Sequence, residues 1–242
     1  MFNEYRNIRA KDEGWYTLPG VNQDKSFITT MLIKDYDIEE VLNQNDIEEC
    51  IVDILKKWKE GEEHIRRLHF HFSGHGIINQ AIDDCEIDKA EQAMDANNPI
   101  LHCLMGNNGE TSLYSVDQIK QLLNQANAEV ITITLDCCRS YDKLREIAKK
   151  KISLGKLPRI PHDNWPKTAV FYPTCESTLA SYDENSFSKE LWKVYQEQDH
   201  HISISKMGKL VNESWSNRMV DQQCTIEMVN VGDNWKNKSW PI

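Results

Sequence analysis

The stretch that decides the fold is Leu68-His69-Phe70-His71-Phe72-Ser73-Gly74-His75-Gly76. Its first five residues alternate a large apolar side chain with a histidine, and this two-residue period predicts a β-strand. The glycines on either side of His75 end that strand in a tight turn. Further on, Val130-Ile131-Thr132-Ile133-Thr134-Leu135 forms a second, β-branched strand and leads directly into Asp136-Cys137-Cys138-Arg139. Each of these two strands therefore ends in residues that can carry out chemistry.

Outward from these strands, helical and strand patterns alternate along the chain. Apolar residues recur at helical spacing over residues 22–34, 45–59, 115–126, 187–196 and 204–215. Further strands are predicted over 36–42, 168–172 and 224–231, with a small hairpin formed by 100–104 and 111–113. This alternation predicts an α/β fold with a mainly parallel central sheet that is covered by helices on both faces.

Composition and charge narrow the class of function. The 242 residues are 40% hydrophobic, which is enough for a core, and 28 basic against 38 acidic residues give a net charge of −10. This acidity argues against binding to nucleic acid or to anionic membranes and is compatible with basic peptides. No run approaches the length of a membrane span, and the first residues lack the pattern of a signal peptide. The seven cysteines are therefore expected to be reduced, in a cytoplasmic protein.

His75 and Cys138 are the candidate catalytic pair. The carboxyl ends of parallel strands meet at one edge of a sheet, so the turns that carry these residues can come together. A thiolate is a strong nucleophile, and an imidazole beside it can take its proton. The backbone N–H groups of Gly76 and Cys138 could then hold the oxyanion of an acyl-transfer intermediate. The alternative is a cysteine that packs in the core beside a plain glycine turn, which each residue taken alone would favour.

Two motifs give the chain a family resemblance. Phe72-Ser73-Gly74-His75-Gly76 followed by Leu135-Asp136-Cys137-Cys138-Arg139 resembles the caspase-fold cysteine peptidases. An acidic residue two positions before the nucleophile is typical of metacaspases and paracaspases, which cleave after Arg or Lys. Arg139 and Phe171-Tyr172-Pro173-Thr174-Cys175 are most similar to paracaspases.

The resemblance implies a domain organisation. It predicts one caspase-like domain over 1–242, a three-layer sandwich, with a large-subunit-like region at 1–140 and a small-subunit-like region at 168–242. Between them, residues 141–167 form a basic linker that contains proline. The fold normally begins with an apolar strand between those predicted at 36–42 and 68–72. Residues 1–17 contain no such strand, so the first strand of the family is expected to be missing.

The resemblance also implies a specificity pocket in which three acids surround a basic side chain. Asp136 is the second of them, and the first and third match Asp24 and Asp183, or Glu184 if the register slips by one. No cofactor is required for this chemistry. The acidic segment 83–88 could bind calcium, as in some metacaspases, but it lacks the spacing of a calcium loop.

Several other residues receive structural interpretations. His69 and His71 point away from the apolar residues of their strand and are expected to be structural, and Cys137 and Cys175 to be packing residues. Members of the fold often pair through the last strand, so a homodimer through the edge strand 224–231 is expected. The intact His–Cys pair favours a cysteine endopeptidase acting on basic peptides. The missing first strand favours the alternative, an inactive caspase-like scaffold that binds partners.

Overall fold

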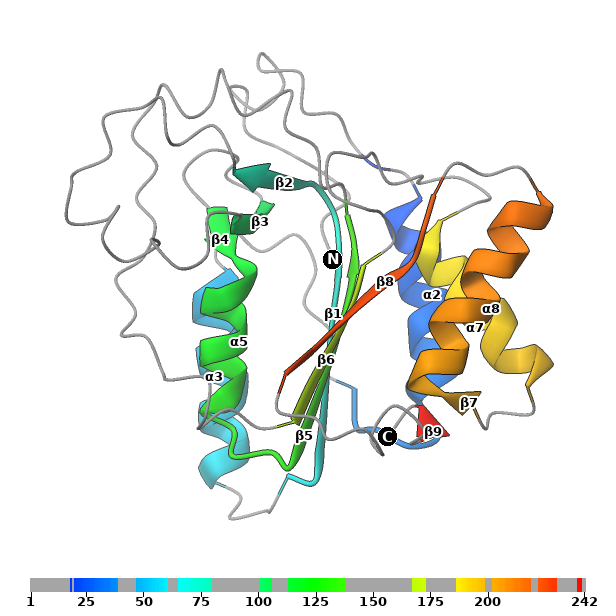
Figure 1. Ribbon diagram of the computed structural model, residues 1–242. Helices are drawn as coiled ribbons and strands as arrows, with labels where there is room; N and C mark the ends of the chain where they lie inside the picture. The colour runs from blue at the N-terminus through cyan, green and yellow to red at the C-terminus, as the bar shows by residue number, and fades with distance from the viewer. Residues whose placement is uncertain are drawn as a thin grey trace.

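A four-stranded β-sheet forms the middle layer of the molecule (Figure 1). A computed structural model of the protein describes residues 18, 20–38, 47–60, 65–79, 101–105, 113–137, 167–172, 186–198, 202–218, 222–229 and 239–240. The strands lie in the order β1 (Arg67–Ser73), β5 (Val130–Asp136), β6 (Lys167–Tyr172) and β8 (Thr225–Val229). The first three run parallel and β8 runs antiparallel to β6, which confirms the predicted, mainly parallel sheet.

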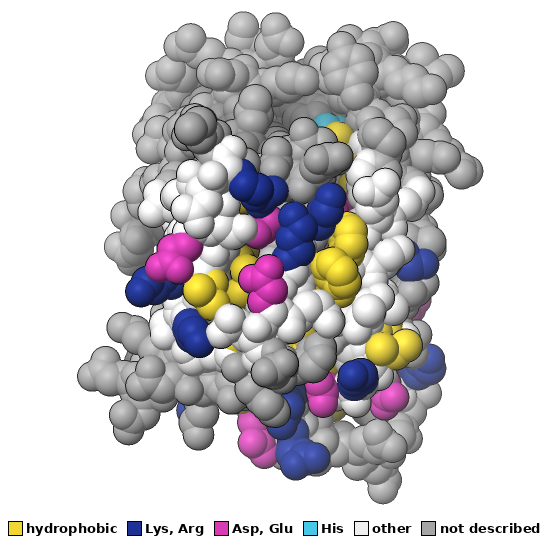
Figure 2. Space-filling model, turned by 90° about the vertical axis from the view of Figure 1, so that its right-hand side faces the viewer, with side chains coloured by type: hydrophobic (Ala, Val, Ile, Leu, Met, Phe, Trp, Pro, Cys, Tyr) yellow, Lys and Arg dark blue, Asp and Glu magenta, His cyan; other side chains and the backbone are white. Residues whose placement is uncertain are grey.

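Helices cover both faces of this sheet (Figure 1). On one side lie α3 (Ile47–Glu60) and α5 (Val116–Asn124), and on the other lie α2 (Val21–Leu32), α7 (Phe187–Glu197) and α8 (Ile204–Asn217). The five predicted helices are thus confirmed, with ends that differ by at most three residues. Figure 2 views the outer side of α2, α7 and α8, where basic, acidic and hydrophobic side chains are mixed.

The hydrophobic core on this second side joins the helices to the sheet. Ala169 and Phe171 of β6 lie in one buried cluster with Phe187 of α7 and with Met207 and Trp215 of α8. Each of these five side chains is fully buried. A buried side chain of the size of Phe contributes about 1.5–3 kcal/mol, so this cluster fixes α7 and α8 on the sheet.

A second, smaller sheet extends the histidine turn. After the turn the chain continues as β2 (Gly76–Asn79), which pairs antiparallel with β3 (Leu101–Met105), and β3 pairs with β4 (Leu113–Ser115). The predicted hairpin is confirmed as β3 and β4, whereas β2 was not predicted. A further short pair is formed by β7 (Ile202–Ser203) and β9 (Ser239–Trp240).

The strand predicted over 36–42 is wrong where the structure describes it. Residues 33–36 form a turn that follows α2, in which the Tyr36 N–H donates to the Leu32 carbonyl at 3.0 Å. Residues 37 and 38 are not in a strand. Ile38 is exposed, so this apolar residue is not part of a buried strand face. Residues 39–42 lie outside the described ranges.

Two expectations about the limits of the domain can be placed only in part. Within the described ranges, β1 is the edge strand of the large sheet, as expected if the first strand of the family is missing; residues 1–17 lie outside those ranges. Lys167 is the first residue of β6 rather than the last of the linker. The rest of the linker, 141–166, also lies outside the described ranges, so the division into regions stays a prediction.

Candidate active site

The carboxyl ends of β1 and β5 lie side by side. Ser73 and Asp136 are partners in the parallel register, and the N–H of Gly74 donates to the Asp136 carbonyl at 3.2 Å. The turn that carries His75 is therefore attached directly to the end of β5. His75 is partly exposed, and the buried Gly76 begins β2, opposite Leu104 of β3.

The structure describes four of the six predicted site residues. Three of them lie at the ends of β1 and β5, and the fourth, Asp24, lies on α2. Asp136 ends β5, and His75 and Gly76 follow β1. The predicted nucleophile Cys138 and the third predicted acid, Asp183, lie outside the described ranges, as does its alternative Glu184. The pairing of histidine and cysteine therefore stays a prediction.

Asp24 is buried on α2, and its carboxylate is bonded on both oxygens. The Ser73 hydroxyl donates to Oδ2 at 2.8 Å, and the Ser186 hydroxyl donates to Oδ1 at 2.7 Å. Burial raises the pKa of Asp24 above its ordinary value, although the hydrogen bonds from Ser186 and Ser73 act in the opposite direction. Three elements thus meet at one carboxylate: α2, the end of β1 and the residue that begins α7.

Asp136 is fully buried, and its two oxygens have different surroundings. Its Oδ2 accepts from the N–H of Ser188 at 2.8 Å and from the Ser188 hydroxyl at 2.7 Å, while Oδ1 is buried with no hydrogen-bond partner among the described residues. Burial raises the pKa of Asp136 well above its ordinary value, and the negative charge of Asp24 raises it further. The N–H and hydroxyl of Ser188 and the nearby backbone N–H of Phe187 lower it in part.

The two acids form a buried pair without a bonded cation. In the part of the chain that the structure describes, no Lys or Arg donates to either carboxylate. Neighbouring carboxylates in a dry site repel each other unless they share a proton or receive a cation. The arrangement is therefore suited to an ammonium or guanidinium group, which would supply the missing donors.

The three serines around the acids were not predicted. Ser186 is the N-cap of α7, where its hydroxyl accepts from the Lys189 N–H at 3.4 Å, and a serine before an apolar helical run is a recognisable capping signal. Ser73 is the last residue of β1 and belongs to the same sequence motif as His75. Nothing in the sequence shows that these hydroxyls, with that of Ser188, converge on Asp24 and Asp136.

His69 and His71 belong to the sheet rather than to the acid pair. Both rings bond the hydroxyl of Thr134, at 3.0 Å from His69 Nε2 and 2.8 Å from His71 Nδ1. Tyr36 packs edge-on against the His69 ring at 6.2 Å between centroids. Burial lowers the pKa of His69 to about 3, and burial with the neighbouring His69 lowers the pKa of His71 well below its ordinary value. Both histidines are therefore neutral at pH 7, in agreement with a structural role.

The remaining candidates contribute packing or fall outside the described ranges. Cys137 is completely buried after β5, which confirms it as a core residue. Cys175 and the acidic segment 83–88 lie outside the described ranges, so calcium binding stays a prediction. Among the described residues, no group of His, Cys, Asp or Glu side chains could hold a metal ion.

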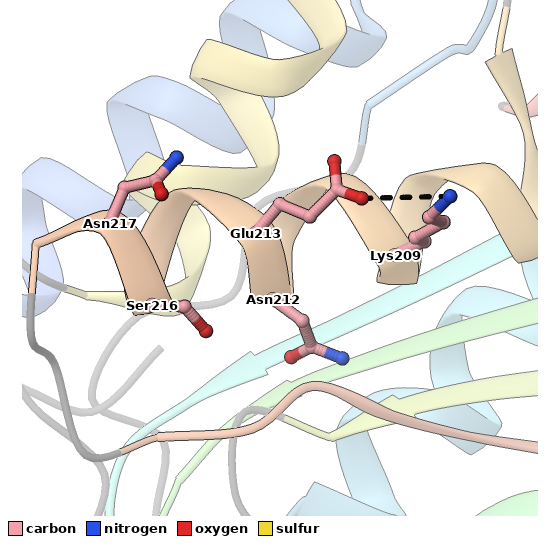
Figure 3. A pocket seen from close by; sticks show the side chains of 5 residues that line it. All are labelled: Lys209, Asn212, Glu213, Ser216 and Asn217. Atoms are coloured by element: carbon pink, nitrogen blue, oxygen red, sulfur yellow. Dashed lines mark ion pairs between the residues drawn. The ribbon is translucent and has the colours of Figure 1, made fainter.

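A hollow along α8 shares no lining residue with the acid pair, and Figure 3 shows the side chains that line it. It is lined by Lys209, Asn212, Glu213, Ser216 and Asn217. Lys209 and Glu213 form an exposed ion pair at 3.6 Å, and Asn212 exchanges two hydrogen bonds with the backbone of Cys224, before β8. The bonds of Asn212 fasten α8 to the segment before β8, and the hollow lacks the nucleophilic or desolvated charged groups that chemistry needs.

The fold and the histidine turn define a caspase-like α/β protein. Residues 3–232 match the family model for the caspase domain, Peptidase_C14. Because that match spans nearly the whole chain, the protein belongs to the caspase-domain family of cysteine peptidases. The closer similarity to paracaspases or metacaspases and the preference for Arg or Lys stay predictions.

Comparison with solved structures agrees on the fold. The crystal structure of protein GSU0716 from Geobacter sulfurreducens has a TM-score of 0.66 and 14% sequence identity, over 98% of this chain and 94% of that chain. At this identity the likeness shows the fold alone. No curated protein matches the sequence. None of the helices in the described ranges is long and apolar enough to cross a bilayer.

Proposed function

We propose that the protein is a cysteine endopeptidase that cleaves peptide bonds after Arg or Lys. The observation that carries this proposal is the buried pair Asp24 and Asp136, which has no bonded cation among the described residues and adjoins the turn of His75. Oδ1 of Asp136 is buried and has no donor among the residues that the structure describes, and a guanidinium or ammonium group of the substrate would provide one. The third acid of this proposed pocket is Asp183.

The proposed reaction is acyl transfer to Cys138. His75 takes the thiol proton, and the thiolate attacks the carbonyl carbon that follows the basic side chain. The N–H groups of Gly76 and Cys138 stabilise the oxyanion of the tetrahedral intermediate. The protonated His75 then donates to the leaving amine, and water attacks the thioester to release the acid and restore the thiol.

Partners and cofactors follow from the same proposal. The substrates are proteins or peptides with accessible basic residues, and no step requires a metal, although calcium is included in the test below. Of the described strands, β8 lies at the edge of the large sheet opposite β1, and we propose this edge as the surface of a homodimer.

The test is cleavage of fluorogenic peptides that end in Arg, Lys or Asp, with and without calcium. We expect the wild-type chain to cleave after Arg or Lys and Cys138→Ala to be inactive. Cleavage only after Asp would keep the nucleophile and refute the acidic pocket. Absence of cleavage by a folded wild-type chain, including at high concentrations of a kosmotropic salt that favours dimers, would refute the peptidase.

A scaffold that binds partners without cleaving them is the second candidate. The two functions differ in the reactivity of Cys138. In a peptidase, an alkylating reagent labels a thiol of lowered pKa ahead of the other cysteines. In a scaffold, Cys138 shows no preference over other accessible thiols.

A further inference from the structure

We propose that Ser188 is a positioning residue that orients the Asp136 carboxylate in the acidic pocket. Ser188 holds Oδ2 of Asp136, so that Oδ1 receives the basic side chain of the substrate. This inference rests on the proposed function, since it assigns how the pocket of that function is oriented. It adds a residue from α7 to the acids that select the substrate.

The contrast between the two acids carries the argument. Asp24 accepts one hydroxyl on each oxygen, from Ser73 and from Ser186, so both of its oxygens have a donor. Within the described part of the chain, the side chain of Asp136 receives two bonds from Ser188, both on Oδ2, and none on Oδ1. A purely structural carboxylate would share its donors between the two oxygens, because a bare buried oxygen is unfavourable.

The position of Ser188 explains why both of its donors reach the same oxygen. It is the second residue of α7, where backbone N–H groups have no partner inside the helix and point toward an anion. Its side chain is fully buried, so water does not compete for the hydroxyl. The N–H and the hydroxyl together fix the rotation of the Asp136 carboxylate and leave Oδ1 as its open acceptor.

Loss of the Ser188 hydroxyl should therefore act on recognition rather than on the reacting atoms. The remaining N–H still bonds Oδ2, but the carboxylate is less fixed and less easily ionised. A basic side chain then binds more weakly in both the ground state and the transition state, which raises KM while kcat is retained.

The experiment compares Ser188→Ala with Ser188→Thr and Ser205→Ala. Ser205 is the second residue of α8 and is exposed. Ser205→Ala therefore removes a hydroxyl from the equivalent helix position, away from the acids. We expect Ser188→Ala to raise KM for Arg and Lys peptides about ten- to a hundredfold, with kcat nearly unchanged. Ser188→Thr, which keeps the hydroxyl, should recover most of the loss, and Ser205→Ala should match wild type.

A second measurement uses benzamidine, an amidinium compound, as an equilibrium probe of the pocket. Wild-type protein should bind it in calorimetry, and Ser188→Ala should bind it at least about tenfold more weakly, with a melting temperature that shows it is folded. This result would support the positioning role even if no peptide is cleaved, in which case only the proposed function fails. Equal binding by Ser188→Ala and wild type, a loss confined to kcat, or no binding by wild type would overturn the inference.

Discussion

At the scale of single residues, the two acids of the pocket differ in how much of their hydrogen-bonding capacity is used. Asp24 is satisfied on both oxygens, whereas Asp136 leaves Oδ1 bare inside the protein. Since Asp136 also lies near a second negative charge, its ionised form is unfavourable in the absence of a ligand. On the proposed function, this cost in stability is what leaves the site able to bind a cation.

Asp136→Asn is expected to stabilise the ligand-free protein at pH 7 while it abolishes cleavage after basic residues. The amide removes the repulsion from Asp24 and needs no ionisation. A gain of 1 kcal/mol corresponds to about 2–4 °C in melting temperature for a chain of this size. Thermal melts of wild type and Asp136→Asn at pH 7 test this, with the exposed Asp53→Asn on α3 as control.

The pH dependence of these melts has a definite sign. The folded-state pKa of Asp136 is raised above 3.8, so its contribution to stability is full below that pH and is lost as pH rises through the folded value. Wild type should lose stability relative to Asp136→Asn as the pH rises from about 4 to 8. A variant that melts below wild type across this range would contradict the assignment of Asp136 as a strained acid.

The sequence predicted part of this site. Asp136 follows from its place two residues before Cys138, and Asp24 from the family resemblance; the structure brings the two carboxylates near each other, and their role in binding stays a prediction. The serines could not be predicted, because a hydroxyl leaves no periodic or charge signal and its partners come from distant segments. The separation of Ser186 from Asp24 is 162 residues, which only the folded chain brings to 2.7 Å.

At the scale of elements, α7 and α8 begin in the same way but serve different ends. Ser186 and Ser203 are their N-caps, accepting from the N–H of Lys189 and of Lys206. Only Ser186 also donates to Asp24. The N-terminus of α7 is thus part of the proposed pocket, while that of α8 is an ordinary cap.

Ser186→Ala and Ser203→Ala should each destabilise the protein by about 1 kcal/mol, the usual loss of a capping hydroxyl. Ser186→Ala should in addition weaken benzamidine binding, because Asp24 loses one of its two donors. Urea denaturation and calorimetry on the two variants measure these effects. Equal binding by both variants would show that the hydrogen bond to Asp24 has no influence on the pocket.

The packing of α8 on β8 can be tested at Gly208. A methyl group there would lie 2.7 Å from Cδ1 of Ile226 and 3.3 Å from its Cγ1. In an Ile226→Val background, which lacks Cδ1, Gly208→Ala should stabilise the protein by up to about 1 kcal/mol through helix propensity. In wild type the same change should gain less or destabilise.

A double-mutant cycle in urea measures this coupling between Gly208 and Ile226. If Gly208→Ala has the same effect in both backgrounds, the two side chains do not limit each other, and the close contact between α8 and β8 would be disproved.

The elements were predicted well where one face is clearly apolar. The five helices and the strands of the large sheet follow from their periods, because burial on the sheet enforces those periods. The strand predicted from residue 36 onward was wrong, because Tyr36 ends the turn after α2 and Ile38 is not in a strand. β2 was not predicted, because Gly76–Asn79 is short and its strand conformation depends on pairing with β3.

At the scale of the whole molecule, the two sides of the predicted linker are joined by the sheet and by the pocket. β5 pairs with β6 across it, and the start of α7 bonds both Asp24 and Asp136. Brief trypsin treatment should cut the basic residues of 141–166 first, and the two fragments should still elute together in gel filtration without denaturant. Separation of the fragments after one cut would show that these contacts do not hold the halves together.

The parallel pairing of β1 with β5 also fixes the register of the residues around the site. His69, His71 and Ser73 lie opposite Thr132, Thr134 and Asp136. Adding or removing one residue inside β1 would turn every following side chain to the opposite face of the sheet. Ser73 would then point away from Asp24, and the histidines would meet the helices of the other layer. Within this strand the spacing itself, and not only the residue types, is therefore under constraint.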